Sequence, residues 1–120
     1  MSIKKDQTEN KSQLVKIATN YFKKKGFKIN YENAIKEGSS GMPRHFDLII
    51  QQNHTEYGVW VRDWNRTIGI NVIITLDTAS EDIGLNKSIM VGEKFSDHAK
   101  AYANRKQIEL LTKQKIQSLR

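Results

Sequence analysis

The sequence contains no cysteine and a single proline. The absence of cysteine excludes disulfides, thiolate metal ligands and cysteine nucleophiles. Seven glycines and one proline in 120 residues are too few for a collagen-like or linker-like chain. Long apolar runs are also absent, because the most apolar stretch, residues 68–76, is interrupted by Asn71 and Thr75. Such a stretch is too short to cross a bilayer.

No apolar segment follows the basic residues at the N-terminus, so we expect no signal peptide. Together these absences predict a soluble cytoplasmic protein without a membrane partner. The length is typical of one domain, and we expect residues 1–120 to form a single domain with its own core.

Positive charge is what the chain has in excess. Twenty Lys and Arg residues against thirteen Asp and Glu residues give a formal net charge of +7 at pH 7. This balance favours polyanionic partners, DNA in particular, but it does not locate a binding surface.

Hydrophobic periodicity predicts a mixture of helices and strands. An apolar stripe at helical spacing predicts a helix over residues 7–25, followed by a stop at Gly26. The stripe consists of Leu14, Ile17, Ala18, Tyr21 and Phe22. Two β-rich runs joined by a short polar segment predict a hairpin over residues 46–62. Thr112 is placed to cap a last helix over residues 112–119.

Residues 68–76 are ambiguous by residue type, because their β-branched side chains favour a strand while their apolar positions also fit helical spacing. The alternation of strands and helices indicates an α/β or α+β sandwich around a mixed sheet.

The predicted hairpin brings three chemically different side chains together. With a turn centred on Asn53 and His54, residues pair when their numbers sum to about 107, which places Asp47 opposite Trp60. Asp47, Trp60 and Arg62 then share one face. The opposite face, which we expect to form the core, carries Leu48, Ile50, Val59 and Val61.

The order of these motifs resembles the restriction-endonuclease-like PD-(D/E)XK superfamily, and within it the Mrr-type (type IV restriction endonuclease) catalytic domain. The resemblance rests on Gly38-Ser-Ser-Gly, Phe46-Asp47-Leu-Ile-Ile, Tyr57-Gly-Val-Trp60-Val-Arg62-Asp-Trp64, Ser88-Ile-Met-Val-Gly and Ile108-Glu-Leu-Leu. It implies a three-layer α/β sandwich with a central mixed sheet of about four or five strands flanked by helices. The implied core order is α-β-β-β-α-β, followed by α-β-α, with residues 68–81 helical.

The resemblance also implies Mg²⁺-dependent phosphodiester cleavage. In this family an Asp on the first hairpin strand and an acid on the second bind Mg²⁺, and a Lys two residues later contacts the attacking water and the phosphate. Asp47 matches the first acid, whereas the second acid falls at Trp60 and the lysine at Arg62. The candidate catalytic residues are therefore Asp47 and Arg62, and the candidate metal ligands are Asp47 and the backbone carbonyl of Val61.

This degenerate motif leaves three functions open. The favoured one is a nucleic-acid-binding protein of nuclease fold whose DNA cleavage is lost or weakened. The second is an active Mg²⁺-dependent DNA endonuclease in which Glu32 or Glu56 replaces the missing acid, and the third is a non-catalytic interaction or scaffold module. Mg²⁺ is the expected cofactor only if cleavage survives.

Basic and aromatic residues around the expected cleft are the candidate nucleic-acid contacts. They are Arg44, Arg62, Trp64 and Arg66. A second explanation fits equally well, in which Asp47 is a buried salt-bridge partner of Arg62 and Trp60 covers the pair. Relatives often carry a separate DNA-reading domain, for which this chain has no room, so a homodimer or a partner protein remains open.

Overall fold

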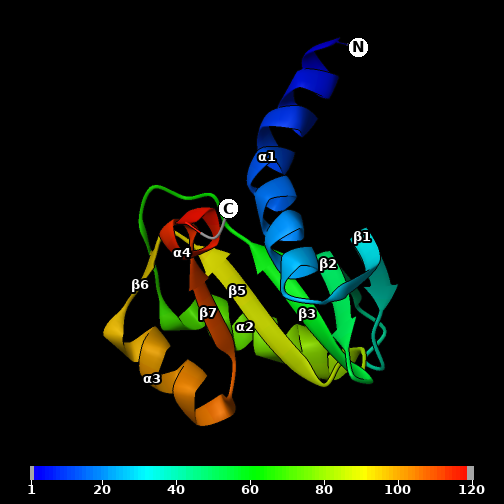
Figure 1. The fold of residues 1–120 in the computed structure, drawn as a ribbon. Helices are drawn as coiled ribbons and strands as arrows, with labels where there is room; N and C mark the ends of the chain where they lie inside the picture. Colours follow the sequence, from blue (N-terminus) through cyan, green and yellow to red (C-terminus); the bar gives the residue numbers. More distant parts are fainter. Residues whose placement is uncertain (1, 119–120) are drawn as a thin grey trace.

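The computed structural model describes the backbone of residues 2–118 and the side chains of residues 13–118. Helices and strands are mixed along the chain (Figure 1). In order they are α1 (Ser2–Lys24), β1 (Lys28–Glu37), β2 (Pro43–Gln52), β3 (Thr55–Val61), β4 (Thr67–Ile68), α2 (Ile70–Asp82), β5 (Lys87–Gly92), β6 (Lys94–Phe95), α3 (Asp97–Lys106), β7 (Glu109–Thr112) and α4 (Lys113–Ser118). Within these described residues, no helix has both the length and the apolar character needed to cross a membrane.

A five-stranded sheet in the order β1-β2-β3-β5-β7 forms the middle layer. Strands β1, β2 and β3 are antiparallel neighbours, whereas β3, β5 and β7 run parallel. Helices α1 and α4 cover one face of the sheet, and α2 and α3 cover the other (Figure 1). This arrangement confirms the predicted three-layer sandwich and its element order, to which the short β4–β6 pair is an addition.

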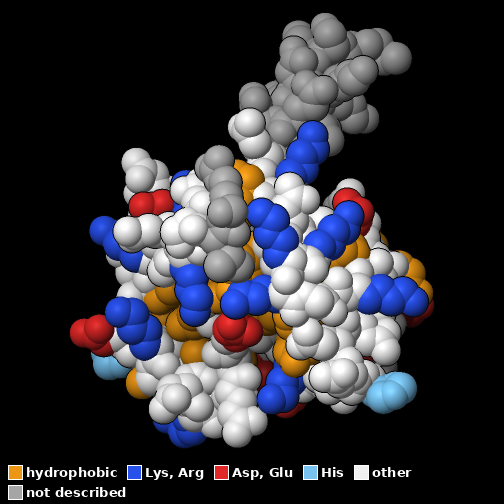
Figure 2. Space-filling view, in the orientation of Figure 1, with side chains coloured by type: hydrophobic (Ala, Val, Ile, Leu, Met, Phe, Trp, Pro, Cys, Tyr) orange, Lys and Arg blue, Asp and Glu red, His pale blue; other side chains and the backbone are white. Residues whose placement is uncertain are grey.

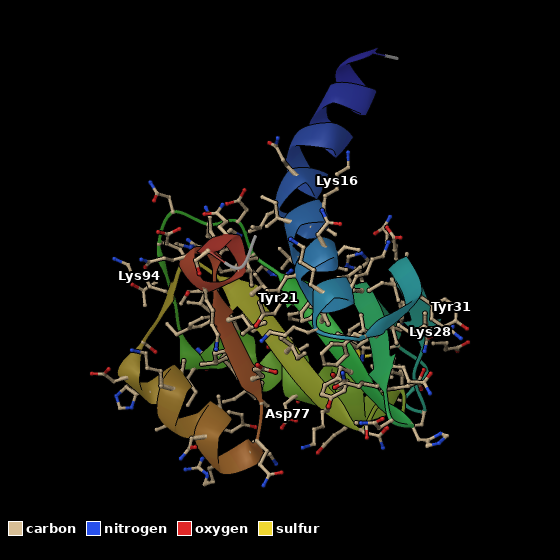
Figure 3. The ribbon with its side chains drawn as sticks, viewed as in Figure 1. Lys16, Tyr21, Lys28, Tyr31, Asp77 and Lys94 are labelled. Carbon is tan, nitrogen blue, oxygen red and sulfur yellow. The ribbon has the colours of Figure 1, made fainter. Side chains whose placement is uncertain are left out.

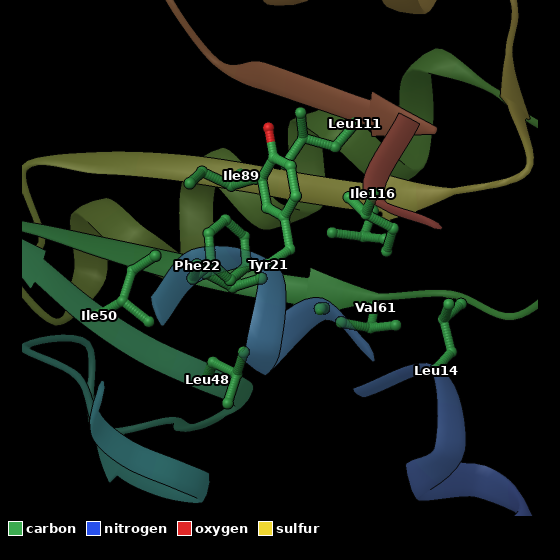
Figure 4. Close-up of a cluster of buried hydrophobic side chains, with 12 residues drawn as sticks. Leu14, Tyr21, Phe22, Leu48, Ile50, Val61, Ile89, Leu111 and Ile116 are labelled. Carbon is green, nitrogen blue, oxygen red and sulfur yellow. The ribbon is translucent and has the colours of Figure 1, made fainter. Parts of the chain in front are cut away.

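Helix α1 covers its face of the sheet with the apolar stripe that its sequence predicts (Figure 4). The buried residues of the stripe are Leu14, Ala18, Tyr21 and Phe22. The helix stops before Gly26, whose φ of 91° lies in the left-handed region. The N–H of Phe27 then donates to the carbonyl of Phe22 at 2.9 Å, which closes the end of the helix. The helix begins at Ser2, upstream of the predicted start at residue 7.

The other face of the sheet carries a second core, which the hairpin pattern does not predict. Phe46 and Ile49 of β2 pack there with residues of α2 and α3. Gly58 of β3 makes this packing possible, because a Cβ atom at this position would lie 2.6 Å from Phe46 Cε1. The expectation that Trp60 lies on a non-core face is therefore wrong, since Trp60 is partly buried against this second core.

The β2–β3 hairpin has the predicted register and turn. Leu48 pairs with Val59, which agrees with the expected sum of residue numbers. Asn53 and His54 form the turn with φ values of 54° and 70°, and a two-residue type I′ turn requires positive φ at both positions. Strand β2 begins at Pro43, upstream of the predicted start.

The ambiguous segment forms helix α2, as the family resemblance implies and residue type alone does not. Its buried apolar positions, Ile73, Leu76 and Ala79, face the second core. The predicted last helix corresponds to α4, where Thr112 Oγ1 accepts the N–H of Lys115 at 3.1 Å.

Candidate functional site

Asp47 lies where strand β2 separates from strand β3. The pairing of the two strands extends as far as Leu48 and Val59. Beyond that pair, Asp47 Oδ2 accepts the backbone N–H of Val61 at 2.7 Å, so a side chain replaces a strand carbonyl as the acceptor. Asp47 is only 9% exposed. A carboxylate buried to this degree requires hydrogen-bonding or cationic partners.

The alternation of side chains along β2 also breaks at Asp47. Phe46 and Leu48 are two residues apart and should share a face of the sheet. Instead Phe46 belongs to the core beside α2, and Leu48 to the core beside α1. On the neighbouring strand, Asn33 lies opposite this break with a φ of 50°. The sheet is thus locally distorted at the position of the candidate acid.

Arg62 is the cationic partner of Asp47. Its Nη1 atom lies 3.4 Å from Asp47 Oδ2 and donates to the carbonyl oxygen of Val61 at 3.3 Å. The Arg62 side chain is 24% exposed. Burial lowers the pKa of Arg62, and the nearby charge of Asp47 opposes that shift. Because the pKa of arginine starts far above neutrality, the guanidinium stays charged at pH 7.

Arg62 also belongs to a group in which two indoles and two guanidiniums alternate. We call these four residues the arginine–tryptophan stack: Trp60, Arg62, Trp64 and Arg66. The Arg62 Cζ atom lies 4.4 Å from the ring centroid of Trp60 and 5.9 Å from that of Trp64. The Arg66 Cζ atom lies 4.4 Å from the ring centroid of Trp64. These are cation–π distances, so the indoles hold the guanidinium planes in place.

A hydrogen bond to the backbone fixes the Trp60 end of the stack. The indole Nε1–H of Trp60 donates to the carbonyl of His45 at 2.7 Å. Asp63, between Arg62 and Trp64 in sequence, is paired with Lys113 at 2.8 Å. The hydrogen bond to Asp63 is the main reason why the pKa of Lys113 is raised. Asp63 therefore neutralises a lysine rather than a member of the stack.

Arg44 belongs to a different cluster. Its Nε atom donates to Asp82 Oδ2 at 2.8 Å, and Asp82 also accepts hydrogen bonds from the Ser40 hydroxyl at 2.7 Å and the Ser40 backbone at 2.9 Å. The hydrogen bonds from Ser40 and Arg44 hold the pKa of Asp82 well below its usual range. Arg44 therefore ties the start of β2 to the end of α2, and Ser40 ties the loop after β1 to the same carboxylate. Nothing local in the sequence marks this cluster, because Arg44 and Asp82 are 38 residues apart.

The side chains around Asp47 do not fit a Mg²⁺ site. Trp60, at the position of the second acid, has no ligand atom for a hard cation. Glu56 accepts a hydrogen bond from Asn30 at 3.2 Å near the hairpin turn, and Glu32 is exposed. Among residues 13–118, no three His, Cys, Asp or Glu side chains are grouped closely enough to hold a metal ion.

Comparisons with known proteins agree with this fold. A family model described as "Restriction endonuclease", the Mrr catalytic domain, matches residues 7–120. No curated protein matches the sequence. A solved structure titled "Crystal Structure of Protein of Unknown Function AF1548" superimposes with a TM-score of 0.73 at 18% sequence identity, and this likeness concerns the fold alone.

The superposition with that structure covers 80% of this chain and 54% of that one, so the chain spans about half of its length. The family match covers nearly the whole sequence and includes the hairpin with Asp47, Trp60 and Arg62. The chain therefore belongs to the Mrr-type restriction endonuclease family.

Proposed function

We propose that this protein binds DNA through its restriction-endonuclease fold and has lost, or greatly weakened, the ability to cleave it. The observation that carries the proposal is the ion pair between Asp47 and Arg62, packed against Trp60. The acid that a nuclease of this family uses for metal binding is here paired with a protein cation instead. We include a cytoplasmic location in the proposal, since a chain without cysteine needs no oxidising compartment.

Loss of cleavage follows from the chemistry of the donor set. Mg²⁺ requires several oxygen ligands in near-octahedral geometry. Asp47 supplies one carboxylate, whose Oδ2 already accepts the N–H of Val61, and Trp60 supplies no oxygen. Arg62 keeps the positive charge of the family lysine, but its guanidinium stays protonated and cannot accept a proton from an attacking water at neutral pH.

Binding of phosphates is supported by the arginine–tryptophan stack. Stacking on the indoles restricts Arg62 and Arg66, so less rotamer entropy is lost when their N–H groups bond to a phosphate. The same stacking places guanidiniums, rather than nucleobases, over the indole rings. We therefore propose contacts to the DNA backbone, which hold the duplex without reading its sequence.

The overall charge of the chain is less informative than this cluster. On the face shown in Figure 2, Lys and Arg side chains are dispersed and interspersed with acidic ones. Lys16, Lys28 and Lys94, labelled in Figure 3, are exposed and lie on three separate elements. The DNA-binding experiment must therefore separate the contribution of the stack from that of the net charge.

Cleavage is tested by incubating supercoiled plasmid with the protein and Mg²⁺ or Mn²⁺. We expect no nicking above the background of an Asp47→Ala variant purified in the same way. Nicking by the wild type that disappears in Asp47→Ala would instead establish the second function, an active endonuclease with substitute acids.

Binding is tested by titrating duplex DNA with the protein at two salt concentrations. Arg62→Ala/Arg66→Ala should reduce the slope of log K against log salt by about two, because two phosphate contacts are lost. Lys23→Ala/Lys24→Ala removes the same charge from the end of α1 and should leave the slope nearly unchanged. Equal effects of the two pairs, or the absence of salt-dependent binding by the wild type, would reject the proposal and favour the scaffold function.

A further inference from the structure

Two oxygen atoms meet the same guanidinium nitrogen at the end of β3. Arg62 Nη1 lies 3.4 Å from Asp47 Oδ2 and 3.3 Å from the carbonyl oxygen of Val61. These are the two oxygens of this chain that match the metal ligands implied by the family pattern. A positively charged group of the protein itself thus lies between the atoms that would otherwise contact a cation.

We propose that the Arg62 guanidinium is a built-in cation that occupies the position of the divalent metal, so that the site holds a phosphodiester without any metal ion. The first half of this proposal concerns only the folded protein. The second half, the phosphodiester, rests on the proposed function.

The charge balance of the site supports the substitution. Two carboxylates, one divalent cation and one lysine sum to +1 in the family pattern. Here the second carboxylate is replaced by Trp60, and the remaining carboxylate of Asp47 is balanced by the single charge of Arg62. A divalent ion added beside the guanidinium would raise this sum from zero to +2, next to a carboxylate that is only 9% exposed.

The two replacements also fit each other sterically. Trp60 takes the sequence position of the second acid, and its ring centroid lies 4.4 Å from Arg62 Cζ. A planar guanidinium can stack on an indole while its edge contacts oxygens, whereas the compact ammonium of lysine cannot do both. The arginine at position 62 and the tryptophan at position 60 therefore act as a pair.

The guanidinium keeps an accessible side for a ligand. Nη1 contacts the two oxygens, yet 24% of the Arg62 side chain remains exposed. Arginine has five N–H donors, so donors remain for a phosphate oxygen. Arg66, stacked on the far indole, is exposed and extends the same basic surface.

The first experiment tests whether a metal ion can bind where the Arg62 guanidinium lies once the family residues are restored. Thermal unfolding of the wild type should be unchanged by millimolar Mn²⁺ at matched ionic strength. The variant Trp60→Glu/Arg62→Lys restores the second acid and the lysine beside the native Asp47. Mn²⁺ at ten times its Kd should raise the Tm of this variant by about 5 °C. Adding Asp47→Asn to this variant should abolish the shift.

Two results of that experiment overturn the proposal. One is an equal Mn²⁺-induced rise in Tm of the wild type, which would mean that the guanidinium does not exclude the metal. The other is a double variant that shows a cooperative unfolding transition but no Mn²⁺-dependent shift.

A second experiment does not depend on folding of the double variant. Arg62→Ala vacates the position, and low millimolar guanidinium should raise its Tm while leaving the wild type unchanged. Arg62→Ala/Asp47→Asn, which lacks the carboxylate, should show no rise. If guanidinium affects Arg62→Ala and the wild type alike, Arg62 does not fill a cation position.

A third experiment addresses the phosphodiester. DNA binding by the wild type should persist in EDTA, and Mg²⁺ should not strengthen it, because Mg²⁺ only competes for the DNA phosphates. Affinity that requires Mg²⁺ contradicts the inference. A complete absence of DNA binding refutes the proposed function and the phosphodiester half of the inference, while the metal and guanidinium experiments still decide the first half.

Discussion

Individual side chains at the end of β3 form a small polar site beside the two apolar cores of the sheet. Replacing Asp47 with Asn keeps an acceptor for the N–H of Val61 but removes the charge that faces Arg62. We expect Asp47→Asn to lower the free energy of unfolding by about 2 kcal/mol, below the cost for a fully buried pair because Arg62 is partly exposed. Urea denaturation at pH 7 measures this difference.

A double-mutant cycle separates the ion pair from other effects of the substitution. Asp47→Asn/Arg62→Gln should cost less than the sum of the two single variants by about 1 kcal/mol, because the unpaired charge disappears with its partner. Additive costs would show that Asp47 and Arg62 do not stabilise each other.

The Asp82 carboxylate should make the stability of the folded protein depend on pH in the acid range. Its pKa is lowered in the folded protein from 3.8 by hydrogen bonds from Ser40 and Arg44. A lowered folded pKa stabilises the protein at pH values above the unfolded pKa, and the contribution is lost as the pH falls toward the folded value. We therefore expect Asp82→Asn to destabilise the protein at pH 7 and to flatten the fall of Tm below pH ~4.

The control for that experiment is Glu37→Gln, which removes one negative charge from the same end of the sheet. It should leave the acid dependence close to that of the wild type. If the Tm of Asp82→Asn falls below pH ~4 as steeply as the Tm of the wild type, the acid dependence does not come from Asp82.

At the scale of elements, close packing of β3 against its neighbours depends on a glycine, which has no side chain. A Cβ atom on Gly58 would lie 2.6 Å from Phe46 Cε1 and 2.8 Å from Leu85 Cδ1. Gly58→Ala should therefore cost about 1–3 kcal/mol through overpacking. Gly69→Ser is the control, since no atom lies within 4 Å of its Cβ position and serine is a good N-cap for α2. Equal stabilities of the two variants would contradict this packing.

Local patterns predict several elements of this fold correctly. The stripe from Leu14 to Phe22 predicts α1, and Asn53 and His54 predict the turn and therefore the register of the hairpin. Helix α2 is different, because its β-branched residues favour a strand, its apolar positions also fit a helix, and only the family resemblance decides between the two. The packing of α2 against the sheet and α3 decides the outcome, as tertiary packing commonly overrides propensity.

The features that the sequence does not predict depend on distant residues. The second core beneath Trp60 is formed by helices that follow the hairpin in sequence, so strand alternation alone could not indicate that this face is covered. The pairing of Arg44 with Asp82 joins elements that only the complete fold brings together. The proximity of Asp47 and Arg62 follows from the register of the hairpin. Their shared hydrogen bonds with the backbone of Val61 depend on the break in β2, which strand alternation does not predict.

At the scale of the whole molecule, the proposed contacts to the DNA backbone predict weak sequence preference. Two duplexes of equal length and unrelated sequence should bind with affinities that differ by less than about threefold, because phosphates are the contacts in both. Competition binding at a fixed salt concentration measures the ratio. A preference of a hundredfold or more would indicate contacts to base edges and would contradict a backbone-only interface.

Both tryptophans of the chain belong to the arginine–tryptophan stack. The ultraviolet emission of the unlabelled protein therefore originates almost entirely from this one place. Any ligand that displaces a guanidinium from an indole should alter the intensity or wavelength of that emission, whereas a ligand bound elsewhere should leave it unchanged. The protein thus carries its own optical reporter for the surface on which its function is proposed to depend.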